Sequence, residues 1–145
     1  MLALKRTLIF FSLFMVISPL ASNIVSIKSA DHFKKLYNGK KPMVAMYTAS
    51  WCGPCQNMKP HFIKSAQKFP QITFCLVDTE NSSLKGLCST IKGLPTTIFS
   101  YNGINIMQQQ GGLTRVQLNE SLERFQSMIK ASLTSKSTKK TSAKK

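Results

Sequence analysis

The sequence predicts an α/β fold built as one domain. From Asn23 onward, short apolar runs alternate with stretches whose apolar residues recur at helical spacing, which is typical of strands and helices that follow one another. Two of these runs, residues 42–49 and 72–77, carry no charge, which indicates strands that are buried on both faces. The chain has 145 residues, about the length of a single domain, so we expect no second complete domain within it.

In the first half of the domain, the sequence predicts two strands and two helices. A short strand at residues 24–27 precedes a helix that Ser29 caps with its side chain and that ends near Asn38. The buried strand at 42–49 then leads into a helix at residues 52–69. Pro60 lies inside that helix and predicts a kink, because proline lacks the amide N–H that a helix interior uses.

In the second half of the domain, the sequence predicts three strands and two helices. The buried strand at 72–77 precedes a helix of about two turns, which would contain Leu84, Leu87 and Ile91. Asn102-Gly103 separates the runs 96–100 and 104–109, and this dipeptide is the strongest short-range signal for a hairpin with a type I′ turn. A last helix at 114–131, with Thr114 as its cap, has one apolar face made of Val116, Leu118, Leu122, Phe125 and Ile129.

Residues 1–22 have the pattern of a secretory signal peptide. Lys5 and Arg6 precede an apolar run of fourteen residues, and small residues follow it. The run is shorter than the ~20 residues of a membrane span. Cleavage after Ala21 would leave Pro19 at a poor position, so an uncleaved anchor over residues 7–27 is an alternative, and a buried helix of a cytosolic protein is a third. We expect a secreted or periplasmic protein, cleaved or anchored.

The net charge of +15 suggests nucleic acid, an anionic membrane or acidic proteins as partners. Much of that charge lies outside the predicted domain at 23–131, because residues 132–145 carry five lysines and no acid. This segment predicts a disordered Lys-rich tail, which could contact an anionic surface. It lacks the aromatic side chains that stack on bases, and no nucleotide-binding motif is present, so we expect no specific nucleic-acid binding.

The pattern Cys52-Gly53-Pro54-Cys55 stands where a buried strand passes into a helix. A cysteine at a helix amino terminus is stabilised as a thiolate by the unpaired N–H groups and the helix dipole, so Cys52 is the predicted nucleophile. Cys55, three residues on, is the predicted resolving thiol. Pro54 suits the first turn, and Trp51 would shield one side of the sulfur and offer a flat apolar contact to a substrate.

Two other readings of the cysteine pair remain open. It could be half of a zinc site, but no second Cys-x-x-Cys exists and the only histidines are His32 and His61. It could also be a purely structural disulfide in an oxidising compartment. We expect no metal and no cofactor.

Two separated motifs, Trp51-Cys52-Gly53-Pro54-Cys55 and the segment at residues 93–97 (GLPTT), resemble the thioredoxin family. The resemblance covers residues 23–131 and implies the thioredoxin fold, a central mixed sheet of about five strands flanked by about four helices. It implies that Pro95 is a cis-proline packed against the active-site sulfurs. It also implies that Gly53 and Pro54 support the active site, and that the backbone of Leu94 and of Gly111 docks an extended substrate segment.

The sequence departs from the family at three positions near the active site. The family carries a buried Asp where this chain has Met46, and a Lys where it has Phe74. Both members of that charged pair are therefore apolar here, which leaves no buried charge unpaired but removes a proton acceptor for Cys55. A tryptophan common in the family is Thr48.

Cys75 and Cys88 are the other two cysteines. Cys75 is opposite in phase to Phe74, so it should face the layer in which the short helix with Cys88 packs. A second disulfide between them is conceivable. Two small buried thiols are the favoured reading.

The function expected from these features is thiol–disulfide exchange on protein disulfides, with the reducing direction favoured, and a role in redox homeostasis. An oxidase or isomerase is the alternative within the class. A non-catalytic module that binds through the groove and the basic tail is the alternative outside it. The expected partners are disulfide-containing proteins and an upstream thiol electron donor, which could be bound to a membrane. The protein is expected to be a monomer.

Overall fold

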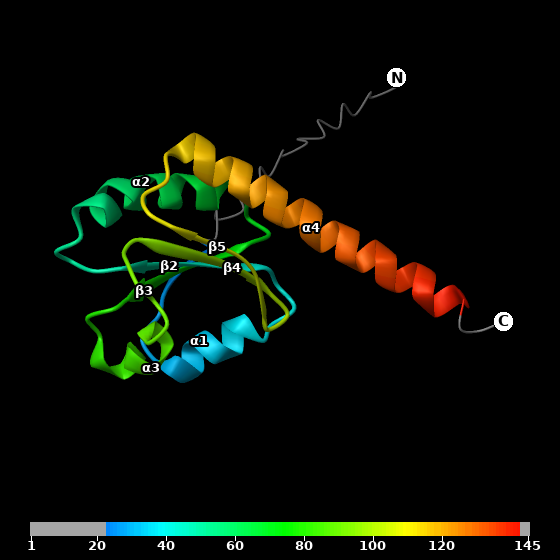
Figure 1. Ribbon diagram of the computed structural model, residues 1–145, viewed down its shortest axis with the longest axis horizontal. Helices are drawn as coiled ribbons and strands as arrows, with labels where there is room; N and C mark the ends of the chain where they lie inside the picture. Colours follow the sequence, from blue (N-terminus) through cyan, green and yellow to red (C-terminus); the bar gives the residue numbers. More distant parts are fainter. Residues whose placement is uncertain (1–22, 143–145) are drawn as a thin grey trace, which may run out of the picture.

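The structure, a computed structural model, describes residues 23–142, and the side chains of that range as far as residue 134. The predicted signal segment and the last three residues lie outside the described residues. Figure 1 shows a central sheet with α2 and α4 on one face and with α1 and α3 on the other. This is the thioredoxin-like arrangement that the sequence predicted, with five strands and four helices in the described part of the chain.

The sheet is mixed, and its strands lie in the order β1-β3-β2-β4-β5. The first three of these are parallel, and β4 and β5 are antiparallel to their neighbours. The strands are β1 (Ile24–Ser26), β2 (Met43–Thr48), β3 (Thr73–Asp78), β4 (Thr96–Tyr101) and β5 (Ile104–Gln110). The helices are α1 (Ala30–Tyr37), α2 (Gly53–Lys68), the 3-10 turn η1 (Ser82–Leu84), α3 (Lys85–Cys88) and α4 (Arg115–Ser142).

Local signals explain several boundaries. The side chain of Ser29 accepts a hydrogen bond from the N–H of His32 at 3.2 Å and so caps α1, as predicted. Asn102 and Gly103 have φ values of 52° and 76°, the left-handed pair that a type I′ turn requires between β4 and β5. Thr114 and Gln117 exchange side-chain-to-backbone hydrogen bonds at the start of α4, which forms a capping box.

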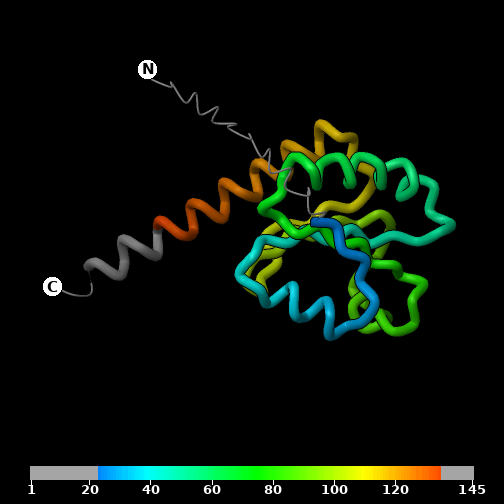
Figure 2. Tube along the Cα trace, turned by 180° about the vertical axis from the view of Figure 1, so that it is seen from behind, coloured from blue at the N-terminus to red at the C-terminus, as the bar shows by residue number. Residues whose placement is uncertain are grey.

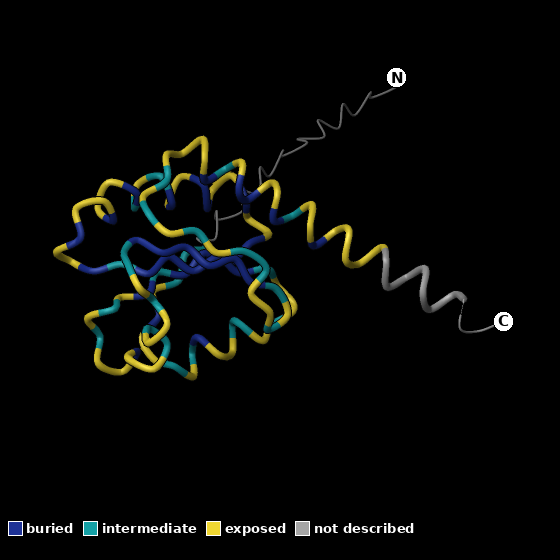
Figure 3. The backbone as a smooth tube through the Cα atoms, in the orientation of Figure 1, coloured by how far each residue is buried: buried dark blue, intermediate teal, exposed yellow. Residues whose placement is uncertain are grey.

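Two apolar layers flank the sheet. Figure 3 shows the buried residues concentrated in the strands, while the helices alternate between buried and exposed positions. The layer between the sheet and helices α2 and α4, called here the α2/α4 layer, contains both active-site cysteines and the largest buried side chains, among them Met46, Phe62, Phe74, Phe99 and Phe125. The layer on the other face, called the α1/α3 layer, contains Phe33, Met43, Tyr47, Cys75 and Leu84. Strand β2 contributes side chains to both layers, which explains its uncharged sequence.

Two segments differ from the expectations. The helix around Leu87 is shorter than two turns, since α3 ends at Cys88 and Ile91 lies beyond it. Helix α4 continues to Ser142, through most of the segment whose composition predicted disorder. A chain with no Gly or Pro between Leu113 and Lys145 gives the helix no stop signal, and extending a formed helix is easier than starting one.

Figures 1 and 2 show the carboxyl-terminal part of α4 leaving the domain and projecting away from it. Among the residues of this helix whose side chains are described, Ile129 is the last that is buried. Within residues 23–142, no helix is long and apolar enough to cross a membrane.

Candidate active site

The two cysteines of the Cys-x-x-Cys motif form a disulfide at the start of α2. Cys52 is the N-cap of that helix. The backbone N–H of Cys55 donates a hydrogen bond to Sγ of Cys52 at 3.3 Å. Cys52 is 4% exposed and Cys55 is completely buried. The geometry therefore places one sulfur at the helix amino terminus near the surface and the other beneath it, which is the predicted arrangement.

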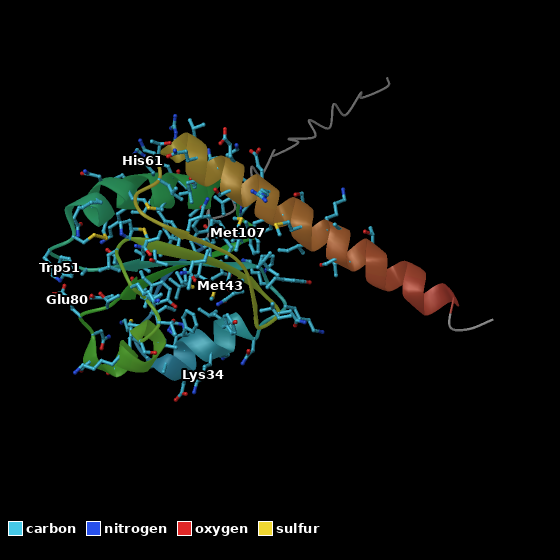
Figure 4. The ribbon with its side chains drawn as sticks, in the orientation of Figure 1. Lys34, Met43, Trp51, His61, Glu80 and Met107 are labelled. Atoms are coloured by element: carbon cyan, nitrogen blue, oxygen red, sulfur yellow. A yellow bond between two sulfur atoms is a disulfide. The ribbon has the colours of Figure 1, made fainter. Side chains whose placement is uncertain are left out.

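Trp51 is the most exposed large apolar side chain of the described residues, at 72%. Figure 4 shows it at the loop that joins β2 to α2, at the end of the sheet. An indole ring in this position offers a flat apolar surface directly beside Cys52, as the sequence predicted.

The loop before β4 faces the same region. The peptide bond between Leu94 and Pro95 is cis, as the resemblance implied. The hydroxyl of Thr96 donates to the carbonyl of Gly93 at 2.7 Å, and the N–H of Gly111 donates to the carbonyl of Pro95 at 2.8 Å. Gly111 has a φ of 99°, a backbone conformation that residues other than glycine rarely adopt. These bonds hold the loop at residues 93–95 against the end of β5.

Two surface hollows are built on parts of this site. One, of about 270 Å³, is lined by Pro54, Asn57, Met58, His61, Gly112, Leu113 and Thr114. The other, of about 250 Å³, is lined by Trp51, Thr79, Cys88, Ile91, Lys92, Gly93 and Leu94. Each hollow is lined by one residue from 51–55 together with residues of a loop that faces it.

Met46 and Phe74 are both fully buried in the α2/α4 layer that holds Cys55. The ring of Phe74 packs edge-on against Phe62 of α2, with 4.9 Å between the ring centres. The buried polar residues in the described part of the chain are all serines and threonines, so no carboxylate and no lysine is buried there. Cys55 therefore has no buried acid–base group beside it, as the apolar exchange in the sequence indicated.

Two features of the site were not predicted. The carboxylate of Glu80 accepts a hydrogen bond from the backbone N–H of Ser50 at 2.7 Å, and hydrogen bonds from Ser50 lower the pKa of Glu80. A hollow of about 620 Å³ lies at the carboxyl ends of β1, β2 and β3, lined by residues that include Thr48, Lys59 and Asp78. Thr48, which stands where the family commonly has a tryptophan, is one of the residues that line this hollow.

Cys75 and Cys88 are both free thiols in the α1/α3 layer. Burial raises the pKa of Cys75 to about 12. Burial, and then the nearby carboxylate of Asp78, also raise the pKa of the half-buried Cys88. The predicted orientation of Cys75 toward the layer of α3 is confirmed, and the structure shows the two thiols unpaired.

The histidines lie apart from the sulfur pair. His32 is on α1, and His61 is on α2, where Figure 4 labels it on the outer side of the helix. Across residues 23–142, no group of three or more His, Cys, Asp or Glu side chains is placed to hold a metal ion.

Comparisons with known proteins agree with this geometry. The family model described as Thioredoxin matches residues 23–124. The thioredoxin of Geodia cydonium is 31% identical over 86 residues, which are 59% of this chain and 81% of that protein. Thioredoxin H5 of Arabidopsis thaliana is 29% identical over 103 residues, 71% of this chain and 81% of that protein.

Solved structures give the same result. The crystal structure of Malassezia sympodialis thioredoxin superposes with a TM-score of 0.64 at 29% identity, covering 70% of this chain and 90% of that one. The structure of oxidised thioredoxin O2 from Arabidopsis thaliana superposes with a TM-score of 0.64 at 28% identity, covering 71% of this chain and 94% of that one.

Proposed function

Because the chain belongs to the thioredoxin family and is a protein thiol–disulfide oxidoreductase, we propose that it reduces protein disulfides with Cys52 as nucleophile and Cys55 as resolving thiol. The observation that carries these roles is the hydrogen bond from the N–H of Cys55 to Sγ of Cys52 at the amino terminus of α2. The same N–H and the helix dipole stabilise negative charge on Cys52 when the disulfide is open.

The first step is attack of the Cys52 thiolate on one sulfur of the substrate disulfide. A new bond forms between Cys52 and that sulfur, the substrate S–S bond breaks, and the second substrate sulfur leaves as a thiolate that takes a proton from solvent. Cys52 is the sulfur suited to this step, because it is the less buried of the pair.

The second step is attack of Cys55 on Sγ of Cys52. The disulfide seen in the structure forms, the mixed disulfide breaks, and the proton of the Cys55 thiol passes to the departing substrate thiolate. The buried polar residues of the described chain are serines and threonines, so this step uses no buried carboxylate as an internal base.

The substrate segment is proposed to lie across Trp51 and the loop of Leu94 and Pro95, with its backbone beside Gly111. Three observations support this placement: the exposed indole of Trp51, the cis bond before Pro95, and the two hollows that adjoin these residues. An extended segment can form backbone hydrogen bonds at such a loop and place its side chains in the hollows.

The reducing direction and the location outside the cytoplasm belong to the proposal. They are supported by the Cys-Gly-Pro-Cys sequence and by the signal-like residues 1–22. A reductant in the periplasm or the secretory route requires an upstream thiol donor to restore the dithiol, and a membrane carrier would supply it. An oxidase or isomerase uses the same two sulfurs and differs in reduction potential.

A second candidate function is attachment to an anionic surface through α4. Beyond Ile129 this helix has no further buried residue among those whose side chains are described, and the sequence after Glu123 contains lysines and one arginine but no acid. A cationic helix that leaves the domain is free to approach a surface of opposite charge.

The deciding experiment is reduction of insulin by the purified chain with dithiothreitol as donor. Wild type should accelerate insulin precipitation, and Cys52→Ser should not. Wild type no faster than Cys52→Ser would defeat the enzymatic proposal. The reduction potential, measured against glutathione, then distinguishes a reductant from an oxidase.

A further inference from the structure

Two buried polar atoms have no hydrogen-bond partner among the residues that the structure describes. They are Oγ1 of Thr97 and Oε1 of Gln109. Thr97 is completely buried in β4, and Gln109 lies directly opposite it on β5. A buried polar group without a partner is costly, so two of them on directly paired residues call for a chemical explanation.

The strand register places this pair in the α2/α4 layer. Thr97 is also directly opposite Met46 on β2, and Phe99, two residues further along β4, is in the core of that layer. Residues two apart on a strand, and residues directly opposite on neighbouring strands, point to the same face of a sheet. Thr97 and Gln109 therefore point toward α2 and α4, in one row with Met46.

The same row lies just beneath the active site. The next step along β4 and β5 toward the site is the hydrogen bond from Gly111 to Pro95, at 2.8 Å. Cys55, fully buried in the first turn of α2, belongs to the same core as Met46. Other buried hydroxyls on the helices of this layer are paired, because Ser65 donates to Asn119 at 2.7 Å and Ser121 donates to the carbonyl of Gln117 at 2.8 Å.

Reduction of the disulfide adds a hydrogen-bond donor to this layer. Opening the disulfide with two electrons and two protons gives two thiols, and one of these protons resides on Sγ of Cys55. In the disulfide form the Thr97 hydroxyl is not bonded to Oε1 of Gln109. When Cys55 carries a proton, its S–H is a donor that the Thr97 hydroxyl can accept, and this bond turns the hydroxyl hydrogen toward Oε1 of Gln109. The bond from Cys55 exists only in the reduced protein.

We propose that Thr97 and Gln109 form a polar relay that stabilises the reduced dithiol by accepting a hydrogen bond from Cys55. Thr97 contacts the thiol, and Gln109 is a positioning residue that orients the Thr97 hydroxyl. Since the disulfide state leaves both oxygens unpaired, the relay raises the reduction potential above that of the same domain with an apolar row. The inference rests on Cys52 and Cys55 being the exchanging pair, and it is independent of the direction of the reaction in the cell.

The test measures the equilibrium between the full-length protein and glutathione, with the reduced fraction read by mass after alkylation. Thr97→Val removes the hydroxyl and keeps the shape of the side chain, and Gln109→Met removes the amide. Each should lower the equilibrium constant for reduction about tenfold, which corresponds to about 30 mV. The double variant should be no lower than either single variant, because one chain is broken in all three.

Thr73→Val is the matched control. Thr73 is a buried threonine at the other end of the parallel strands, where it pairs with Met43 of the α1/α3 layer, and its variant should stay within about twofold of wild type. An unchanged or raised constant for Thr97→Val would overturn the proposal. Insulin reduction by wild type is measured separately, so failure of the relay and failure of the proposed function give different results.

A second readout separates hydrogen bonding from a structural effect. The infrared difference spectrum between reduced and oxidised protein isolates the S–H stretching bands of Cys52 and Cys55 from those of Cys75 and Cys88. In wild type, one band should be displaced to the lower frequency of a hydrogen-bonded thiol, and in Thr97→Val it should return to that of a free thiol. The same band position in both proteins would contradict the relay.

Discussion

The carboxylate of Glu80 accepts a hydrogen bond from the backbone N–H of Ser50 at 2.7 Å. Ser50 lies two residues before Cys52, the proposed nucleophile. The side-chain amide of Gln56 adds a bond to the carbonyl of Ala49 from the first turn of α2, at 3.2 Å. The loop between β2 and α2 is thus tied at both ends of the Ala49–Ser50 peptide, by a residue that follows β3 and by one on α2. These contacts keep Cys52 at the helix terminus while Trp51 stands in solvent.

Replacing Glu80 should therefore loosen this loop. In Glu80→Ala, the amide of Ser50 should lose several-fold in protection against hydrogen exchange at pH 7, and Glu80→Gln, which keeps an acceptor oxygen, should lose less. Hydrogen bonds from Ser50 lower the pKa of Glu80, so its contribution is complete above the unfolded carboxyl pKa of about 4.3 and is lost as the pH falls through the lower folded value. Equal protection in wild type and Glu80→Ala at pH 7 would contradict this role.

Cys55→Ser should trap the mixed disulfide between Cys52 and its substrate. The first step needs only Cys52, whereas the release of substrate needs the second sulfur. After incubation with an oxidised protein substrate, this variant should give a covalent adduct on a non-reducing gel, and Cys52→Ser should give none. An adduct formed by Cys52→Ser through Cys55 would reverse the assigned roles.

The four thiols of the reduced protein should alkylate at very different rates. Burial raises the pKa of Cys75 to about 12, so at pH 8 only about one molecule in 10⁴ carries its thiolate. With iodoacetamide followed by mass mapping, Cys52 should react first, the half-buried Cys88 more slowly, and Cys75 only after unfolding in urea. Unfolding in urea is the control, because Cys75 and Cys88 should then react at the same rate.

Alkylation without reductant tests the pairing of Cys75 with Cys88 in the native protein. The structure shows both as free thiols. Two added alkyl groups after unfolding are therefore expected, and a protein that takes up none would contain a second disulfide.

A carboxylate introduced beneath the active site should destabilise the folded protein. Met46→Asp places an acid in a fully buried position whose neighbour Phe74 is apolar, so we expect a loss of about 3–5 kcal/mol in the free energy of unfolding at pH 7. Burial raises the folded pKa of such an acid, so the destabilisation should shrink as the pH falls toward the unfolded value of about 3.9. Urea unfolding at both pH values measures this, and the double variant with Phe74→Lys should recover part of the loss.

Removal of residues 132–145 should leave the domain intact. Among the α4 residues whose side chains are described, Ile129 is the last that is buried, so the free energy of unfolding should change by no more than about 0.5 kcal/mol, with insulin reduction unchanged. Binding to vesicles that contain anionic lipid should be lost, and in the full chain it should weaken with added salt. Equal vesicle binding by both proteins would remove the second candidate function.

Local patterns predicted most of the fold and the sulfur chemistry. Ser29, the Asn102-Gly103 turn and the cysteine at the start of α2 each act through residues within four positions, so their signals are complete in the sequence. The length of α4 was not predictable from composition, because a lysine-rich segment with many serines is equally compatible with a disordered tail and with the end of a formed helix.

Features that depend on register between distant segments could not be read from the sequence. The bond from Ser50 to Glu80 joins residues 30 positions apart, and the Thr97–Gln109 pair exists only because β4 and β5 align these two residues. In the sequence, Thr97 follows another threonine and Gln109 is the middle one of three consecutive glutamines, so neither residue stands out. Only the strand register shows that they are partners.

A 4% exposed Cys52 stands next to a 72% exposed Trp51. The indole offers a broad apolar contact to a partner protein, whereas the Cys52 sulfur offers only a small opening to an attacking or attacked group. A flexible chain segment can adjust its position to so small an opening more readily than a rigid one. We therefore expect disulfides in loosely folded chains to react with this protein before those of compact native proteins.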